Sequence, residues 1–148
     1  MAKKGSSKNF EKFISEGMIE LDKKGYAKAA KFFQKAAQAD EERYEPYLYL
    51  GNLYFEEGKE DEARKNYLTA IEMNPKVKED FLSSAKLLYE KKVYARAILE
   101  LKKIILLDKE NWDAVSLLVK IYSEDEKFDK AKKCLENIYE QNPDSVDV

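Results

Sequence analysis

Histidine and cysteine, two side chains that often carry acid–base, nucleophilic or metal chemistry, are nearly absent from this sequence. None of the 148 residues is a histidine, so the commonest general base and an important metal ligand are missing. The one cysteine, Cys134, has no imidazole to activate it, and a single cysteine can form neither an internal disulfide nor a structural zinc site. We therefore interpret Cys134 as a buried or half-buried thiol.

Carboxylates are abundant, but their pattern does not indicate a catalytic pair. Adjacent acids occur at Glu56–Glu57 and Glu124–Asp125, at expected turns of a chain in which 38% of residues are charged. The five glycines stand apart from one another, so no glycine-rich loop is available to hold a phosphate. We expect these acids to be solvated, and the sequence predicts neither an enzyme nor a cofactor or metal site.

Charge and hydropathy limit the classes of partner. Lys and Arg total 27 and Asp and Glu total 29, which gives a net charge of −2, and neither half of the sequence has a strong excess of one sign. Nucleic acid and anionic membranes attract a more one-sided positive charge. No apolar run approaches the ~20 residues of a spanning helix, and the first residues, MAKKGSSKN, lack the apolar core of a signal peptide. We expect a cytoplasmic protein that neither binds nucleic acid nor inserts into a membrane.

The sequence does carry a repeat, which is clearest in Tyr44–Val77. Apolar and small residues recur there three and four positions apart, the spacing that places them on one side of a helix. The same classes of residue recur 34 positions before and after this stretch, without any insertion. Position 8 of the four copies holds Gly17, Gly51, Ala85 and Val119, and position 20 holds Ala29, Ala63, Ala97 and Ala131. Position 24 holds Phe33, Tyr67, Leu101 and Leu135, and position 27 holds Ala36, Ala70, Ile104 and Ile138.

The second copy resembles the tetratricopeptide repeat, whose pattern is W-x2-L-G-x2-Y…A-x3-F…P. Tyrosine replaces the first tryptophan and the phenylalanine, and the other positions agree. The residues that carry the match are Tyr47, Leu50, Gly51, Tyr54, Ala63, Tyr67 and Pro75. The resemblance implies an all-α, right-handed solenoid of antiparallel helix pairs. We predict one domain over 10–145 with repeats at 10–43, 44–77, 78–111 and 112–145, a disordered lead-in at 1–9 and a tail at 146–148.

Each repeat is expected to contain two helices joined by a tight turn. Short side chains allow two helices to approach closely, so the small residues at positions 8, 20 and 27 are expected at the crossing of each pair. Ile104, Val119 and Ile138 are larger and predict slightly wider pairs in the last two repeats. The predicted helices are 10–23, 26–39, 44–57, 60–73, 78–91, 94–107, 112–125 and 128–141. The predicted turns lie at 24–25, 58–59, 91–92 and 126–127.

The resemblance implies a partner on the concave face, which the first helix of each repeat lines with positions 2, 5, 6, 9, 12 and 13. The middle of this face is apolar and aromatic in the first three repeats and lies between two acidic rows. Tyr49, Phe55 and Tyr89 are the predicted anchors. The candidate residues are Ile14, Met18, Leu48, Tyr49, Asn52, Phe55, Leu82, Lys86 and Tyr89, with Glu45, Glu56, Glu79 and Glu90 at the edges.

Two interpretations of the acidic rows stay open. Acids at position 2 favour the start of a helix through its macrodipole, by about 0.3–1 kcal/mol each, without any ligand. Acids at position 13 lie at the helix end, where the dipole disfavours them. A protein or peptide partner with apolar anchors and basic residues would explain both rows, and a solvated face is the alternative.

One ligand class within the family can be tested on the sequence. Co-chaperones of this family hold the C-terminal carboxylate of heat-shock chaperones with Lys, Asn and Arg side chains at positions 2, 5, 6 and 9 of successive repeats. The corresponding residues are Ile14, Met18, Tyr49, Glu79 and Ser83, or, one repeat later, Leu48, Asn52, Ser83, Asp113 and Leu117. Only Asn52 fits, so we predict that the chain does not bind this carboxylate motif.

The last predicted helix carries Leu135, Ile138 and Tyr139 with no further helix to cover them. Terminal repeats of a solenoid need a polar outer face, so either the chain is part of a longer protein or this face contacts another molecule. A self-associating scaffold that uses the last repeat is therefore the alternative to an adaptor with a bound peptide. A docking domain of a larger protein is a third.

Overall fold

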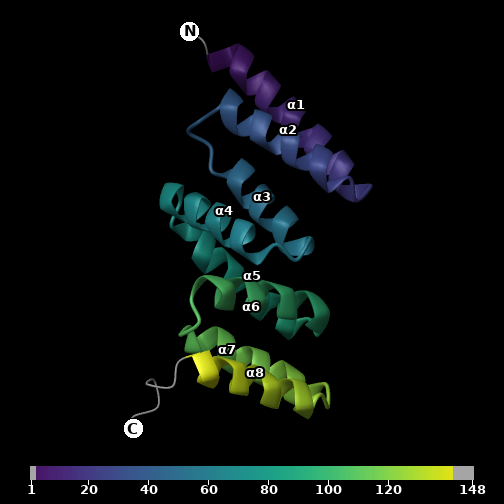
Figure 1. Cartoon of the computed structure of the whole chain (residues 1–148), viewed down its shortest axis with the longest axis vertical. Coiled ribbons are helices and arrows are strands. Elements are labelled where there is room, and N and C mark those ends of the chain that lie inside the picture. Colours follow the sequence, from purple (N-terminus) through teal and green to yellow (C-terminus); the bar gives the residue numbers. More distant parts are fainter. Residues whose placement is uncertain (1–2, 142–148) are drawn as a thin grey trace. The chain divides into compact units, whose positions relative to one another are not determined.

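The computed structural model describes residues 3–141, and this part of the chain contains eight α-helices and no strand (Figure 1). The predicted all-α fold class is confirmed. The helices are α1 (Lys3–Asp22), α2 (Tyr26–Ala39), α3 (Glu45–Glu56), α4 (Glu60–Met73), α5 (Lys76–Glu90), α6 (Tyr94–Leu107), α7 (Trp112–Glu124) and α8 (Phe128–Gln141). The second helix of each repeat has the predicted bounds.

The largest difference from the predicted boundaries is at the start of the chain. Helix α1 begins at Lys3, so residues 3–9 are helical and the prediction of a disordered lead-in was wrong for them. Nucleating a helix is the costly step, and each further residue adds one backbone hydrogen bond. With α1 anchored by buried Phe10, a segment without proline extends it toward the N-terminus. The predicted tail at 146–148 lies outside the described residues.

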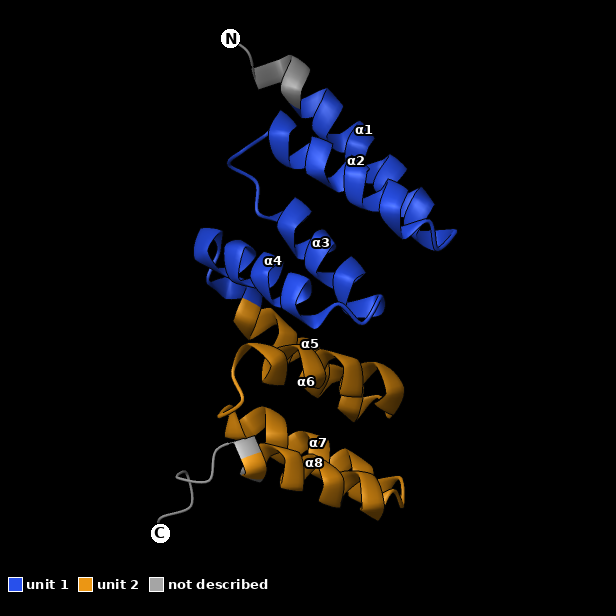
Figure 2. Cartoon of the chain, in the orientation of Figure 1, with its two compact units in different colours: residues 1–77 blue, residues 78–148 orange. Residues whose placement is uncertain are grey.

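The chain divides into two compact units, residues 1–77 and 78–148 (Figure 2). The division falls at the boundary predicted between the second and third repeats. Unit 1 contains α1 to α4, and unit 2 contains α6 to α8 with α5 from Lys78 onward. Each unit is described by itself below.

The core of unit 1 is formed where α2 packs against α3. Ala29, Ala30 and Phe33 of α2 form one buried cluster with Leu50 and Leu53 of α3. Full burial of a Phe or Leu side chain contributes roughly 1.5–3 kcal/mol. This cluster therefore joins the helix pair α1–α2 to the pair α3–α4.

Within each pair of unit 1, a glycine faces an aromatic ring. A Cβ built on Gly17 would lie 2.5 Å from Phe33 Cε1, and one built on Gly51 would lie 2.5 Å from Tyr67 Cδ1. Both rings are fully buried. Glycine at position 8 is therefore required because position 24 is aromatic.

The alanines at the crossing positions are buried in both units. Positions 20 and 27 are completely buried in the first three repeats, at Ala29, Ala63, Ala97, Ala36, Ala70 and Ile104. In unit 2, where position 24 is leucine, position 8 holds Ala85 and Val119. Position 8 is thus larger in unit 2, where position 24 is not aromatic.

The turn inside each repeat has the same backbone geometry. Residue 15 of every repeat has a positive φ, at Lys24, Gly58, Lys92 and Glu126. In the first turn the Lys24 N–H donates to the Leu21 carbonyl at 2.9 Å and the Gly25 N–H donates to the Glu20 carbonyl at 2.8 Å. These two bonds are those of a Schellman cap, and they end each first helix at a fixed point.

The glycine–aromatic contact predicts a specific coupling between two substitutions. Gly17→Ala should destabilise the chain, because the methyl group collides with the Phe33 ring at a cost of roughly 1–3 kcal/mol. The double variant Gly17→Ala with Phe33→Leu copies the Ala85–Leu101 pair of unit 2. Its loss of stability should be smaller than the sum of the two single losses, as measured by urea unfolding followed by circular dichroism. If the two single losses of stability simply add in the double variant, the contact with Phe33 is not the reason that position 17 is glycine.

Candidate functional site

The structure places little conventional chemistry on the chain. Cys134 is half-buried as predicted, and burial raises the pKa of its thiol. Across residues 3–141 no group of three or more Cys, Asp or Glu side chains could hold a metal ion. None of the helices described is long and apolar enough to cross a membrane. The candidate site is the one that the sequence analysis predicted, the set of surfaces that the first helices present.

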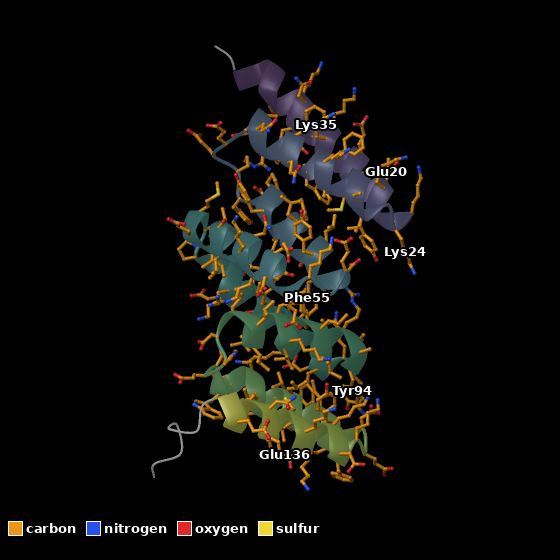
Figure 3. The ribbon with its side chains drawn as sticks, viewed as in Figure 1. Glu20, Lys24, Lys35, Phe55, Tyr94 and Glu136 are labelled. Carbon is orange, nitrogen blue, oxygen red and sulfur yellow. The ribbon has the colours of Figure 1, made fainter. Side chains whose placement is uncertain are left out.

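The first-helix surface of unit 1 consists of half-buried apolar side chains. Ile14 and Met18 of α1 and Tyr49 of α3 pack on the edge of the α2–α3 core cluster. Leu48 and Phe55 of α3 are likewise half-buried; Figure 3 labels Phe55. The structure thus brings residues from α1 and α3 around a common core while leaving part of each side chain accessible.

Tyr49 is less available than a freely exposed anchor would be. Its ring centroid lies 5.4 Å from that of Phe33, and burial raises the pKa of its hydroxyl, with a smaller contribution from the Glu45 carboxylate. Tyr49 therefore contributes to the packing of unit 1 as well as to its surface.

Asn52, the one residue that fitted the carboxylate-binding pattern, has a structural partner. The Tyr67 hydroxyl donates to Asn52 Oδ1 at 2.7 Å. This bond satisfies the hydroxyl of a fully buried ring across the helix pair α3–α4. Asn52 is thus held by its own repeat.

The acidic edge of unit 1 includes an arginine that the sequence analysis missed. Arg43 Nη2 donates to Glu45 Oε1 at 2.9 Å, and its Nε donates to Glu45 Oε2 at 3.1 Å. Arg43 also lies 3.9 Å from Glu11 Oε1 and over the ring of Phe10. This bidentate contact lowers the pKa of Glu45. The ion pair could have been predicted from the sequence, because Arg43 is only two residues from Glu45.

The corresponding candidates of unit 2 lie on α5. Leu82 and Tyr89 are half-buried, while Lys86, Glu79 and Glu90 are exposed. Glu56 in unit 1 is exposed as well. The acids predicted at the edges therefore differ: Glu45 is held by arginine, and Glu56, Glu79 and Glu90 face solvent.

A cluster of polar and aromatic side chains connects α5, α6 and α7 in unit 2. The Tyr89 hydroxyl donates to Glu124 Oε1 at 2.6 Å, and the Tyr94 hydroxyl donates to Glu124 Oε2 at 2.9 Å. The two rings are stacked with centroids 6.1 Å apart, and Lys120 Nζ lies 5.1 Å from the Tyr89 centroid. We call these four residues the Glu124 cluster; Figure 3 labels Tyr94.

The Glu124 cluster accounts for one acid that the helix dipole could not explain. Hydrogen bonds from Tyr89 and then Tyr94 lower the pKa of Glu124, although Glu124 lies at the last residue of α7. Sequence analysis named Tyr89 as an anchor and Glu124 as one of two adjacent acids at a turn, but it did not pair them and did not single out Lys120. Tyr94, which begins α6, was missed because it lies outside the first helices.

A family model described as the tetratricopeptide repeat matches residues 20–81 and 88–148. The chain therefore belongs to the tetratricopeptide repeat family, as the sequence pattern indicated. A comparison with curated proteins finds no match.

Solved structures show the same fold at low sequence identity. PilF of Pseudomonas aeruginosa has a TM-score of 0.52 and 20% identity over 96% of this chain, which spans 65% of that chain. The TPR domain of Arabidopsis OM64 has a TM-score of 0.52 and 15% identity, covering 80% of this chain and 98% of that one. The first TPR of Spaghetti (RPAP3), bound to an HSP90 peptide, has a TM-score of 0.51 and 17% identity, covering 80% and 94%.

The Arg43–Glu45 contact predicts how one carboxyl titrates. Because the folded-state pKa of Glu45 is lowered, the contact adds stability above the ordinary glutamate pKa of about 4.3, and this stability is lost as the pH falls through the lowered value. Arg43→Gln should return the carboxyl midpoint toward the ordinary range, measured by NMR titration of the Glu45 Cδ resonance. Arg64→Gln, at an exposed site, is the control and should leave it unchanged. An unaltered midpoint in Arg43→Gln would contradict the assigned contact.

Proposed function

We propose that the chain is a protein-interaction module that binds a polypeptide segment on its first-helix surfaces. The observation that carries the proposal is the partial burial of the apolar residues there. Ile14, Met18, Leu48, Phe55 and Leu82 are neither core residues nor fully exposed. Such side chains are held in position by the fold and still offer apolar area, which is what anchoring pockets at interfaces require.

The charges beside these residues support a partner that carries basic side chains. Glu56, Glu79 and Glu90 are exposed, and each can attract a cation during encounter. Such attraction mainly accelerates association and orients the partner. We therefore propose a cytoplasmic adaptor for an amphipathic or extended segment with apolar anchors and lysine or arginine residues.

Peptide binding by other proteins of this fold supports a protein-interaction module. The residues of this chain argue against one class of ligand, acidic C-terminal peptides. The RPAP3 domains are bound to the peptides SRMEEVD of HSP90 and SGPTIEEVD of HSP70. Both peptides end in Glu-Glu-Val-Asp, whereas this chain has Glu79 at a position where the carboxylate-binding pattern has a lysine. Asn52, its one matching residue, accepts the Tyr67 hydroxyl. We propose that acidic C-terminal peptides of this kind do not bind.

Self-association through the last repeat is the second candidate, and Leu135 favours it. Leu135 is 43% exposed, while Phe33, Tyr67 and Leu101 at the same position are completely buried. Ile138 is buried at 9%, so less of this face is open than the sequence predicted; the side chain of Tyr139 lies outside the described set.

The first proposal is tested by selecting peptides from a display library on the wild-type chain. The tightest peptide is then measured against the variant Leu48→Ser/Phe55→Ser and, in unit 2, against Leu82→Ser. Loss of anchors should weaken binding at least about tenfold. Binding should also weaken as salt rises from about 0.05 M to about 0.5 M, because screening shortens the reach of the acidic side chains.

The control variant is Leu68→Ser/Leu99→Ser, which makes the same kind of change on α4 and α6. These leucines are 44% and 48% exposed, so this variant tests whether any exposed apolar residue suffices. Thermal unfolding of each variant separates lost binding from lost structure. Unchanged affinity in the first-helix variants, with a light-scattering mass that rises with concentration, would refute the first proposal and favour self-association.

A further inference from the structure

The Glu124 cluster is an exposed arrangement in which an aromatic surface and a carboxylate meet beside a cation. It is built from three helices of unit 2: Tyr89 from α5, Tyr94 from α6, and Lys120 and Glu124 from α7. We propose that this cluster is a subsite for an arginine side chain of the bound polypeptide, which replaces Lys120 over the Tyr89 ring. The proposal rests on the proposed function, since the arginine belongs to that partner.

The carboxylate of Glu124 can accept further hydrogen bonds. A carboxylate has about four acceptor sites, and the two tyrosine hydroxyls use one site on each oxygen. Glu124 is exposed, so its remaining acceptor sites are open to solvent. The hydroxyls fix the orientation of the group and favour its ionised form, which a cationic ligand requires.

The chain itself shows that a cation is accommodated here. Lys120 Nζ lies 5.1 Å from the centroid of Tyr89, within the ~6 Å range of cation–π contacts. Lys120 is exposed and also hydrogen-bonds the Tyr89 side chain. Water can replace that hydrogen bond when the lysine leaves the ring. Lys120 thus occupies the place that a partner's cation would take and competes with it.

Guanidinium chemistry matches the cluster better than an ammonium group does. A guanidinium is planar and can stack on an aromatic ring, and its parallel N–H groups match the two oxygens of a carboxylate. The Tyr89 ring and the Glu124 carboxylate are joined by a 2.6 Å hydrogen bond, so one arginine can contact both. An ammonium group can lie over the ring and hydrogen-bond the Tyr89 side chain, as Lys120 does, but it cannot present two parallel N–H groups to the carboxylate.

The position of the cluster agrees with the binding surface argued above. Tyr89, Lys120 and Glu124 occupy positions 12, 9 and 13 of their repeats, and all three positions belong to the first-helix face. The cluster therefore makes the first-helix face of unit 2 favour a basic residue of the partner at this point.

The test titrates the full chain with N-acetyl-arginine amide and follows the ring resonances of Tyr89 and Tyr94 by NMR. Matched titrations use N-acetyl-lysine amide and N-acetyl-glutamine amide. The arginine probe should give saturable shifts, the lysine probe weaker ones and the glutamine probe none. Lys120→Gln should tighten arginine binding about two- to fivefold by removing the competitor. Glu124→Gln should weaken it about tenfold or more.

Glu136→Gln is the control, because Glu136 is an exposed acid of unit 2 that lies on α8, outside both the cluster and the first-helix surface. It should leave the arginine titration unchanged, and backbone amide spectra confirm that each variant is folded. Absent shifts, equal binding of lysine, or equal weakening by Glu136→Gln and Glu124→Gln would overturn the subsite. If selected peptides still lose affinity in Leu48→Ser/Phe55→Ser, only the subsite fails; if no peptide binds, the proposed function fails with it.

Discussion

The close approach of a glycine to an aromatic ring is the contact on which the helix pairs of unit 1 depend. A single methyl group at Gly17 or Gly51 would stand 2.5 Å from the ring of Phe33 or Tyr67, which no unstrained packing allows. The ring fills the crossing of its own pair, and Phe33 continues into the cluster with Leu50 and Leu53. Phe33 therefore packs within the pair α1–α2 and also joins this pair to α3.

This packing gives the first helices side chains that both stabilise the fold and belong to the proposed binding surface. Tyr49 packs on Phe33, Asn52 holds the hydroxyl of Tyr67, and Glu124 holds two tyrosines. A binding surface made of such residues is preorganised, because its side chains lose little freedom when a ligand arrives. The same arrangement means that removing a surface residue also disturbs stability, so binding and unfolding must be measured together.

The fold was predictable because the repeat is local: spacing within 34 residues determines the helices, their crossing and their turns. The contacts of the surface depend on pairs between repeats, which periodicity does not reveal. Arg43 with Glu45 and Tyr89 with Glu124 are such pairs, at separations of two and 35 residues. Residues 3–9 were mispredicted because composition suggested disorder, whereas continuation of α1 from buried Phe10 determined their structure.

The central claim is that a polypeptide contacts the first helices. NMR cross-saturation from a selected, protonated peptide to methyl groups of the deuterated chain tests this contact directly. Saturation should reach the methyls of Leu48 and Leu82 on α3 and α5 and should bypass the more exposed Leu68 and Leu99 on α4 and α6. Saturation of Leu68 and Leu99 in place of Leu48 and Leu82 would contradict the account.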